Sequence, residues 1–332
     1  MQEIIEDDNL TYVFSSKWGT FGSEPGQLRY PFGIALDSSG NVFVTDSGNH
    51  RIQKFSSSGN FIQTWGTLGS AVSQFNDPSG IAVDRSGNVY VGDRQNHRIQ
   101  KFGNNGTFIR TWDIDTANGQ IYWPYGVAVD RSANVFVVDL INCRILKFTN
   151  TGTFIRKWGT RGSAVNQFEF PMHVAVDSDG NVYVADTSNH RIQKFTSEGT
   201  YIRTWGGFGS GDGQFNYAHG VAVDTSGNVF VSDSQVVPPP DNAFVSQNGN
   251  GRIPSGNAFV SQNGNGRIQK FTNTGIFTTR WGSQGSADGQ LLSAQGIAIK
   301  SATVSFLEER VYVADTGNSR IQVFKPRIEV HP

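Results

Sequence analysis

The sequence has a single cysteine, almost no net charge and no long apolar run. Cys143 is alone among 332 residues, which excludes an internal disulfide framework and any metal site built from several thiolates. Lysine and arginine number 27 against 28 aspartates and glutamates, so the net charge of −1 removes the simplest electrostatic case for nucleic acid as the main partner. No stretch approaches the roughly 18 apolar residues of a membrane-spanning helix, and residues 1–10 lack the basic and apolar regions of a signal peptide. We therefore expect no membrane insertion; the cytoplasm is favoured, although the compartment stays open.

Glycine is the residue that the chain has in excess. It occupies 39 positions, while proline occupies 11 and methionine 2. Short runs rich in valine, isoleucine, phenylalanine and threonine alternate with glycine and asparagine, which is typical of strands joined by tight hairpin turns. The composition therefore indicates an all-β protein.

Tryptophan marks an internal repeat. It recurs at positions 18, 65, 112, 158, 205 and 281, and an aspartate at positions 37, 84, 130, 177 and 224 keeps the same interval of about 47 residues. Only the last interval between tryptophans is longer, at 76 residues, which places one insertion in the fifth unit. Six repeated units therefore account for almost the whole chain.

Each unit contains four short strand-like runs, such as 32–36, 41–45, 51–55 and 61–65. Many of these runs are apolar on both faces, which is typical of strands covered on both sides. Repeated four-stranded units that stack and close into a ring predict a six-bladed β-propeller of four-stranded antiparallel blades.

The two ends of the chain predict how the ring closes. A lone fourth-strand segment at 11–18 begins the first unit, whereas the last unit ends after its third strand, so we expect the N-terminal strand to complete the C-terminal blade. The predicted organisation is a tail at 1–10, one propeller at 11–325 and a tail at 326–332, in a monomer.

The insertion in the fifth blade, at about 234–262, contains a near-exact duplication, because residues 242–253 repeat as 257–268. Both copies resemble 228–233. The sequence leaves open whether 228–233 or 257–262 supplies the second strand of that blade.

The motif P-x-G-[IV]-A-[VL]-D, then G-N-[VF]-x-V-x-D, then N-H-R-I-Q-K-F resembles the NHL repeat family. The N-H-R-I signature is spelled in full at 49–52, 96–99 and 189–192. The resemblance implies a propeller, and similar propellers serve as substrate-binding parts of tripartite-motif ubiquitin ligases, as RNA binders, as sensor domains and as a zinc-dependent amidating lyase. One cysteine cannot supply a RING or B-box, so a ligase role would need another chain.

Two repeated features are expected to be structural. An aspartate and an arginine recur in every blade, as in Asp46 with Arg51, and we expect the carboxylate to cap a turn and pair with the guanidinium. His50, His97 and His190 recur at one turn position, where a metal site is not expected because each lies on a different blade.

The candidate binding site lies on the face where the loops between blades vary most, at the mouth of the central channel. Aromatic and histidine side chains concentrate there. The candidate residues are Phe32, Tyr122, Trp123, Tyr125, Phe170, Met172, His173, Tyr217 and His219. A protein or peptide is the expected partner and a small ligand is an alternative, while packing of half of these residues between blades is the competing interpretation.

The leading interpretation is a non-enzymatic recognition or scaffold propeller with no catalytic residue, no metal and no cofactor. The alternative is a metal-dependent lyase or hydrolase, with zinc or calcium at the channel mouth held by His173 and His219. The resemblance to the amidating lyase implies histidines at the residue after the proline, which only His219 matches. RNA binding is the third interpretation, because Arg29 and Arg161 supply a basic face only thinly.

Overall fold

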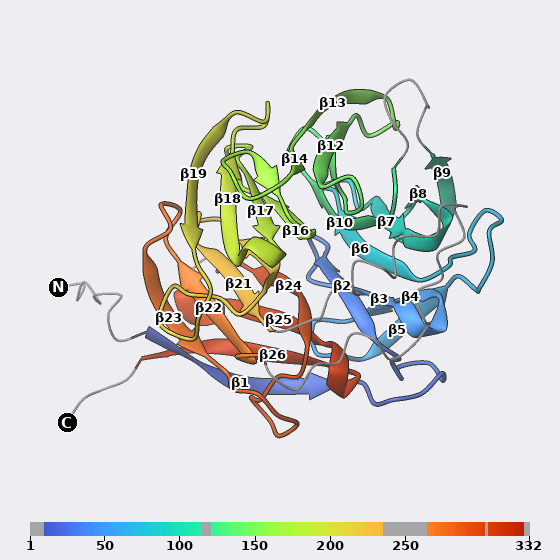
Figure 1. Cartoon of the computed structure of the whole chain (residues 1–332). Helices are drawn as coiled ribbons and strands as arrows, with labels where there is room; N and C mark the ends of the chain where they lie inside the picture. The colour runs from blue at the N-terminus through green and yellow to red at the C-terminus, as the bar shows by residue number, and fades with distance from the viewer. Residues whose placement is uncertain (1–9, 114–120, 235–263, 303–304, 329–332) are drawn as a thin grey trace.

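The computed structural model describes residues 10–113, 121–234, 264–302 and 305–328. Six four-stranded antiparallel sheets are arranged around a central axis, as Figure 1 shows. The six-bladed propeller predicted from the sequence is therefore confirmed.

Blades 1 to 3 follow one another along the chain, each with its strands in sequence order from the axis outwards. Blade 1 contains β2 (Pro31–Leu36), β3 (Val42–Asp46), β4 (Arg51–Phe55) and β5 (Phe61–Trp65). Blade 2 contains β6 (Pro78–Val83), β7 (Val89–Asp93), β8 (Arg98–Phe102) and β9 (Phe108–Trp112). Blade 3 contains β10 (Pro124–Val129), β11 (Val135–Asp139), β12 (Arg144–Phe148) and β13 (Phe154–Trp158).

Blades 4 and 5 repeat the pattern, and blade 6 takes strands from both ends of the chain. Blade 4 contains β16 (Pro171–Val176), β17 (Val182–Asp186), β18 (Arg191–Phe195) and β19 (Tyr201–Gly206). Blade 5 contains β20 (Ala218–Val223), β21 (Val229–Asp233), β22 (Arg267–Phe271) and β23 (Phe277–Trp281). Blade 6 contains β24 (Ala294–Lys300), β25 (Arg310–Asp315), β26 (Arg320–Ile328) and β1 (Leu10–Trp18).

Short elements complete the described chain. Single 3₁₀ turns follow several second strands, and a two-stranded parallel ladder closes one loop. These elements are η2 (Ser47–Asn49), η3 (Arg94–Asn96), η4 (Thr187–Asn189), η6 (Phe306–Glu308), η7 (Thr316–Asn318), β14 (Thr160–Arg161) and β15 (Gln167–Phe168).

The ring closes through β1, as the sequence predicts. This strand pairs antiparallel with β26 from Leu10 opposite Ile328 to Trp18 opposite Ile321. In blade 5 the second strand is β21, so the first of the two competing copies fills that place. The rest of the insertion, residues 235–263, lies outside the described residues.

Burial falls from the axis outwards. In β3, for example, all five residues are buried, whereas β5 is largely exposed or half-buried. The apolar side chains on both faces of the second strands pack between neighbouring blades, which explains why these runs do not alternate with polar residues. Each blade therefore contributes to two layers of the core.

A buried aspartate holds each loop between blades in place. Asp46 ends β3 and is fully buried; its carboxylate accepts hydrogen bonds from Arg51 Nε at 2.7 Å and from Asn49 Nδ2 at 2.9 Å. It also accepts one from the backbone N–H of Arg29, in the loop that precedes β2, at 2.6 Å. The Arg51 guanidinium also donates to backbone carbonyl groups of that loop, including Ser23 O at 2.7 Å.

The same ion pair recurs in all six blades. The arginine Nε to aspartate Oδ2 distance is 2.7 or 2.8 Å in every copy. The pairs are Asp46 with Arg51, Asp93 with Arg98, Asp139 with Arg144, Asp186 with Arg191, Asp233 with Arg267 and Asp315 with Arg320. The expectation of a structural role is confirmed, with the addition that the pair also fixes a loop.

We predict that Asp186→Asn lowers the free energy of unfolding by about 3 kcal/mol, because it leaves the Arg191 guanidinium without its buried counter-charge. Chemical denaturation of the full chain measures this. Asp179→Asn, on an exposed turn of the same blade, is the control and should change stability by less than about 0.5 kcal/mol. Equal effects of the two substitutions would contradict the role assigned to the buried pair.

Candidate functional site

One face of the propeller is formed by the loops between blades, and we call it the loop face. It consists of residues 19–30, 66–77, 159–170, 207–217 and 282–293, with the described part of 113–123. The buried aspartates accept hydrogen bonds from the backbone of these loops and so hold the loops in place. The outer residues of the loops therefore lie on a fixed backbone.

The residue before each first strand has a left-handed backbone conformation. All six are residues other than glycine, although φ lies between 46° and 72°. They are Tyr30, Asp77, Trp123, Phe170, Tyr217 and Ser293. Because side chains rarely adopt this conformation, a glycine would be the least strained choice at this position. Six side chains are thus retained around the channel mouth at a cost in backbone strain.

Two positions further along the chain, a second ring of side chains lines the axis. Every member of this ring is buried. The ring consists of Phe32, Ser79, Tyr125, Met172, His219 and Gln295. Phe32 from blade 1 contacts Tyr125 from blade 3, with ring centroids 4.7 Å apart, and His219 from blade 5 at 5.8 Å. Side chains from three alternate blades thus meet at the axis.

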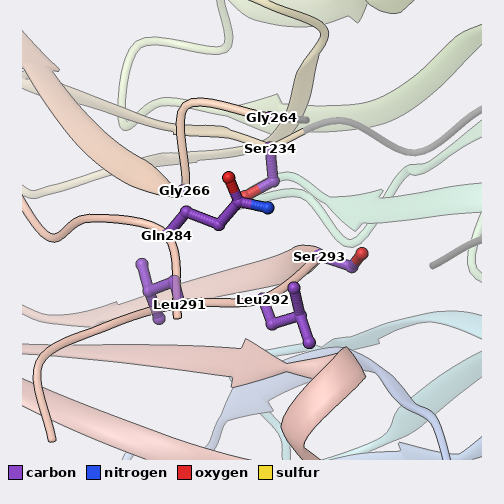
Figure 2. A pocket seen from close by; sticks show the side chains of 7 residues that line it. All are labelled: Ser234, Gly264, Gly266, Gln284, Leu291, Leu292 and Ser293. Carbon is purple, nitrogen blue, oxygen red and sulfur yellow. The ribbon is translucent and has the colours of Figure 1, made fainter. Parts of the chain in front are cut away.

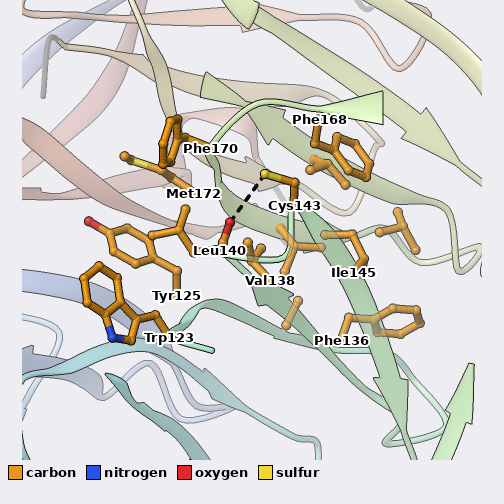
Figure 3. Close-up of a cluster of buried hydrophobic side chains, with 14 of the residues drawn as sticks. Trp123, Tyr125, Phe136, Val138, Leu140, Cys143, Ile145, Phe168, Phe170 and Met172 are labelled. Atoms are coloured by element: carbon orange, nitrogen blue, oxygen red, sulfur yellow. Dashed lines mark hydrogen bonds between the residues drawn. The ribbon is translucent and has the colours of Figure 1, made fainter. Parts of the chain in front are cut away.

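The structure divides the nine predicted site residues into buried and accessible ones. Five of them belong to one apolar core cluster: Phe32, Trp123, Tyr125, Phe170 and Met172. Figure 3 shows the last four of these. His173 and His219 are buried too, with 8% and 0% exposure. Tyr122, with 41% exposure, and the half-buried Tyr217 are the two members that reach solvent. The predicted residues do lie together, but most of them form the floor beneath the loop face.

The two axial histidines are held in the neutral state. Burial lowers the pKa of His173 to about 4. Burial and the neighbouring His173 lower the pKa of His219 to about 3, with the Gln295 backbone opposing this shift. Neither ring nitrogen of His219 has a hydrogen-bond partner among the described residues. Such imidazoles resist protonation because charge in an apolar environment is costly.

The histidine pair does not fit the donor set of a catalytic metal. Zinc enzymes use three protein ligands and an open position. Among the described residues, no group of three or more His, Cys, Asp or Glu side chains is placed to hold an ion. The rings that pack near His219 are instead those of Phe32, at 5.8 Å, and Tyr125, at 6.2 Å.

We predict that acid destabilises this protein partly through His173. The folded-state pKa of about 4 lies below the unfolded value of 6.5, so stability present above pH 6.5 is lost as the pH falls towards 4. The loss attributable to this residue is about 3 kcal/mol. Denaturation curves for wild type and His173→Gln across this range measure it, and the variant should show the shallower slope. Parallel pH profiles would contradict the prediction.

The repeated turn histidines tie neighbouring blades together at the mouth. Nδ1 of His50 accepts a hydrogen bond from the Asp77 backbone N–H at 3.0 Å, and His190 does the same for Tyr217 at 3.1 Å. Burial lowers the pKa of both imidazoles, as the acceptor role requires. The sequence marked these residues only as turn residues, because their partners lie 27 positions further along the chain.

Arg94 is a site residue that the sequence analysis missed. It occupies the first position of η3, where the other blades carry serine, threonine or leucine, and it is buried. Its guanidinium forms an ion pair with Asp77 and lies over the rings of Trp123, at 6.0 Å, and Tyr125, at 5.5 Å. The one available signal was a charged residue at a position where the other blades have an uncharged one. Arg94 stiffens the aromatic floor between blades 2 and 3.

The loop face also exposes large apolar side chains that the sequence analysis missed. We call this set the apolar rim: Phe21, Leu68, Val72, Val165 and Phe208, with exposed fractions from 54% to 70%. Three of its members, Phe21, Leu68 and Phe208, follow the repeat tryptophan by three residues, a register that could have identified them.

Charged side chains on this face are largely paired with one another. Arg161 contacts Glu169 at 2.8 Å and Arg280 contacts Asp212 at 3.0 Å. Arg29 lies over the Phe21 ring at 5.9 Å. The face therefore combines exposed apolar side chains with charged groups that are mostly paired.

A shallow depression lies between blades 5 and 6, as Figure 2 shows. Its lining is Ser234, Gly264, Gly266, Gln284, Leu291, Leu292 and Ser293. Gly266 stands where three other blades have the turn histidine, and a Cβ atom there would lie 2.5 Å from Gln284 Cα. Glycine thus lets the last loop between blades approach closely.

Fold and repeat together define the class of this protein as a closed six-bladed β-propeller. Residues 28–55, 75–102 and 168–195 match the family model described as NHL repeat, which confirms the resemblance seen in the sequence. Three segments of the chain thus carry the NHL repeat. No helix among the described residues is long and apolar enough to cross a membrane.

Curated relatives match over a single repeat-sized segment. The "B-box type zinc finger protein ncl-1" of Caenorhabditis elegans is 41% identical over 49 residues, which is 15% of this chain and 6% of that protein. The "E3 ubiquitin-protein ligase TRIM32" of Homo sapiens is 43% identical over 47 residues, which is 14% of this chain and 7% of that protein. The match thus spans only a small part of the length of these relatives.

Solved structures match over almost the whole chain. A "Streptogramin B lyase structure" has a TM-score of 0.58 at 17% identity and covers 96% of this chain and 98% of its own. A structure described as a gluconolactonase from Xanthomonas campestris has a TM-score of 0.59 at 11% identity and covers 96% and 97%. These likenesses establish the propeller fold and nothing finer.

Proposed function

We propose that this protein is a non-enzymatic recognition propeller that binds a protein or peptide through its loop face. The observation that carries the proposal is the apolar rim, because five large apolar side chains are exposed on loops that buried ion pairs hold rigid. Exposed apolar groups on a rigid scaffold are typical of surfaces that bind a partner.

The partner packs its apolar side chains against the rim and reaches Tyr122 and Tyr217 at the channel mouth. His190 supports this contact, since its ring lies 5.0 Å from Phe208 and 4.6 Å from Tyr217. Because both rings already pack against His190, less side-chain conformational entropy is lost on binding than for free side chains. The comparison proteins with ligase and zinc-finger names are consistent with a recognition role for such repeats.

The two alternative functions have less support. An enzyme with zinc or calcium needs a fuller ligand set than the histidine pair supplies. RNA binding needs concentrated positive charge, whereas Arg161 is neutralised by Glu169.

We predict that Phe21→Ser combined with Phe208→Ser weakens peptide binding by about tenfold or more, because large exposed anchors supply most of the energy at such interfaces. Peptides selected from a random display library on the wild-type chain provide the probes, and their Kd values are measured on each variant. The thermal midpoint should change little, since both side chains are exposed.

The matched control is Ile202→Ser with Ile276→Ser, which removes exposed apolar side chains from blades 4 and 5 outside the loop face. It should leave peptide affinity unchanged. Selected peptides that bind the rim variant as tightly as the wild type would contradict the proposed site.

We also predict that the purified protein carries no stoichiometric zinc or calcium, because the axial groups are too few to hold an ion tightly. Mass spectrometry before and after mild chelation measures the content. About one zinc or calcium per chain, lost in the His173→Ala and His219→Ala double variant, would overturn this prediction and favour the lyase or hydrolase alternative.

A further inference from the structure

His190 holds two rings of the proposed site at the same time. Its Nδ1 accepts a hydrogen bond from the Tyr217 backbone N–H at 3.1 Å, and its ring lies 4.6 Å from the ring of Tyr217. Phe208 meets the imidazole edge-to-face, with ring centroids 5.0 Å apart and an angle of 64° between the planes. Both partners belong to the loop between β19 and β20, so one imidazole fixes the two ends of that loop.

The hydrogen bond to Tyr217 acts on a strained part of the backbone. Tyr217 has a φ of 72°, the largest value among the six residues that precede first strands. A side chain in this left-handed region is kept there by the contacts around it. Loss of the acceptor therefore lets the Tyr217 backbone relax, and the Tyr217 ring moves with it.

The hydrogen bond requires the neutral imidazole. A neutral histidine has one ring nitrogen that accepts and one that donates, whereas both nitrogens donate in the protonated ring. A protonated Nδ1 would therefore set two donors against each other across the 3.1 Å to the Tyr217 nitrogen. His190 is half-buried, so water reaches its ring while the chain stays folded. Burial lowers the pKa of His190 from its ordinary value of 6.5, which agrees with this geometry.

No charged side chain among the described residues contributes to the lowered pKa of His190, because burial is its one cause. Asp186 and Arg191, on either side of the turn, pair with each other at 2.7 Å. On the neighbouring strands β16 and β20, His173 and His219 stay neutral above about pH 5, since their pKa values are about 4 and about 3. A proton on His190 is therefore opposed by the closed loop and favoured once the loop opens.

The other two turn histidines are placed differently. Three carboxylates act on the imidazole of His50, with Asp77 the strongest, so a proton there gains an attraction. Two carboxylates act on His97 in the same direction, and its hydrogen bond from the Trp123 backbone is longer, at 3.4 Å. Of the three, only His190 loses its contact without gaining such an attraction.

We propose that His190 is a positioning residue that makes partner binding at the loop face dependent on pH: the neutral ring holds Tyr217 and Phe208 in place, and protonation releases them. This inference rests on the proposed function, because the partner contacts these two rings. The closed loop has its full stability above pH 6.5 and loses it as the pH falls through the lower pKa of the closed state. Acidification therefore weakens binding.

Hydrogen exchange followed by mass spectrometry on the full chain tests the loop without a partner. Exchange of residues 207–217 is compared with exchange of 159–170 between about pH 7.5 and about pH 5, after correction for intrinsic rates. Both loops are hydrogen-bonded to an equivalent buried aspartate, Asp233 and Asp186, but the turn residue of the second loop is Cys143, which has no imidazole. In the wild type the ratio of the two exchange rates should rise roughly threefold or more on acidification. A constant ratio would overturn the proposal.

His190→Asn removes the titration but keeps a side-chain acceptor, and asparagine tolerates the φ of 54° at this residue. The ratio should then no longer change with pH. The matched control is His50→Asn at the same turn position of blade 1, whose hydrogen bond goes to Asp77 in another loop, so the response of 207–217 should remain. An unchanged response in His190→Asn, or an equal loss in both variants, would overturn the proposal.

A second variant keeps the test decisive if His190→Asn folds poorly. His190→Ser introduces the residue that blade 6 has at this position, Ser319, and removes the imidazole altogether. Residues 207–217 should then exchange at every pH as fast as they do in the acidified wild type. Exchange as slow as in the neutral wild type would contradict the holding role of His190.

Peptide binding tests the regulation of the site. Display-selected peptides with blocked ends and without His, Asp or Glu are the probes, so that pH acts on the protein alone. Between about pH 7.5 and about pH 5 the wild-type Kd should rise about fivefold or more, and the Kd of His190→Asn by less than about twofold. Equal pH dependence in both proteins would overturn the proposal. Failure of the proposed function differs, because Phe21→Ser with Phe208→Ser would then bind as tightly as the wild type at neutral pH.

Discussion

The structure depends on the buried aspartate that ends each second strand. Asp46 and its five counterparts are fully buried or nearly so, and each would be costly in an apolar core without its donors. The donors come from three places: the following turn, the third strand, and the backbone of the loop that arrives from the previous blade. Because one carboxylate satisfies all three, the strands within a blade and the loops between blades are fixed by the same charge.

That arrangement explains why the loop face can vary without loss of the fold. The arginine of each pair donates to loop carbonyl groups, so the backbone of the loop is hydrogen-bonded whatever its side chains are. The side chains are then free to serve recognition, and Phe21, Leu68 and Phe208 are exposed on otherwise equivalent loops. The buried ion pairs thus hold in place the loops that expose these apolar side chains.

The junction between blades 5 and 6 shows how the contacts change where the repeat ends. Five inter-blade junctions use a turn glycine against an indole, and the sixth uses Tyr12 stacked on Trp281. The closing strand β1 comes from the other end of the chain, so no hairpin turn joins it to β26. The Tyr12 side chain makes the contacts that the turn makes in the other blades. Lys270 donates there to the Tyr12 hydroxyl, which in turn donates to Glu309, whereas the equivalent lysines of blades 1 to 4 each donate to a backbone carbonyl group of the next blade.

Much of this protein was determined by the sequence alone. The number of blades, the four strands in each, the closing strand and the structural role of Asp46 with Arg51 all follow from a period of about 47 residues and its turn residues, because each reflects contacts repeated at fixed spacing. Only the tertiary structure decided which candidate residues reach solvent. Phe32, Tyr125 and His219 lie on alternate blades and meet at the axis, a contact between units that no local pattern reports. Arg94 and Tyr12 were missed because each departs from the repeat at one position, and its effect depends on what the ring brings against it. The apolar rim does keep a register in the sequence, but only the folded loops show that its side chains are exposed.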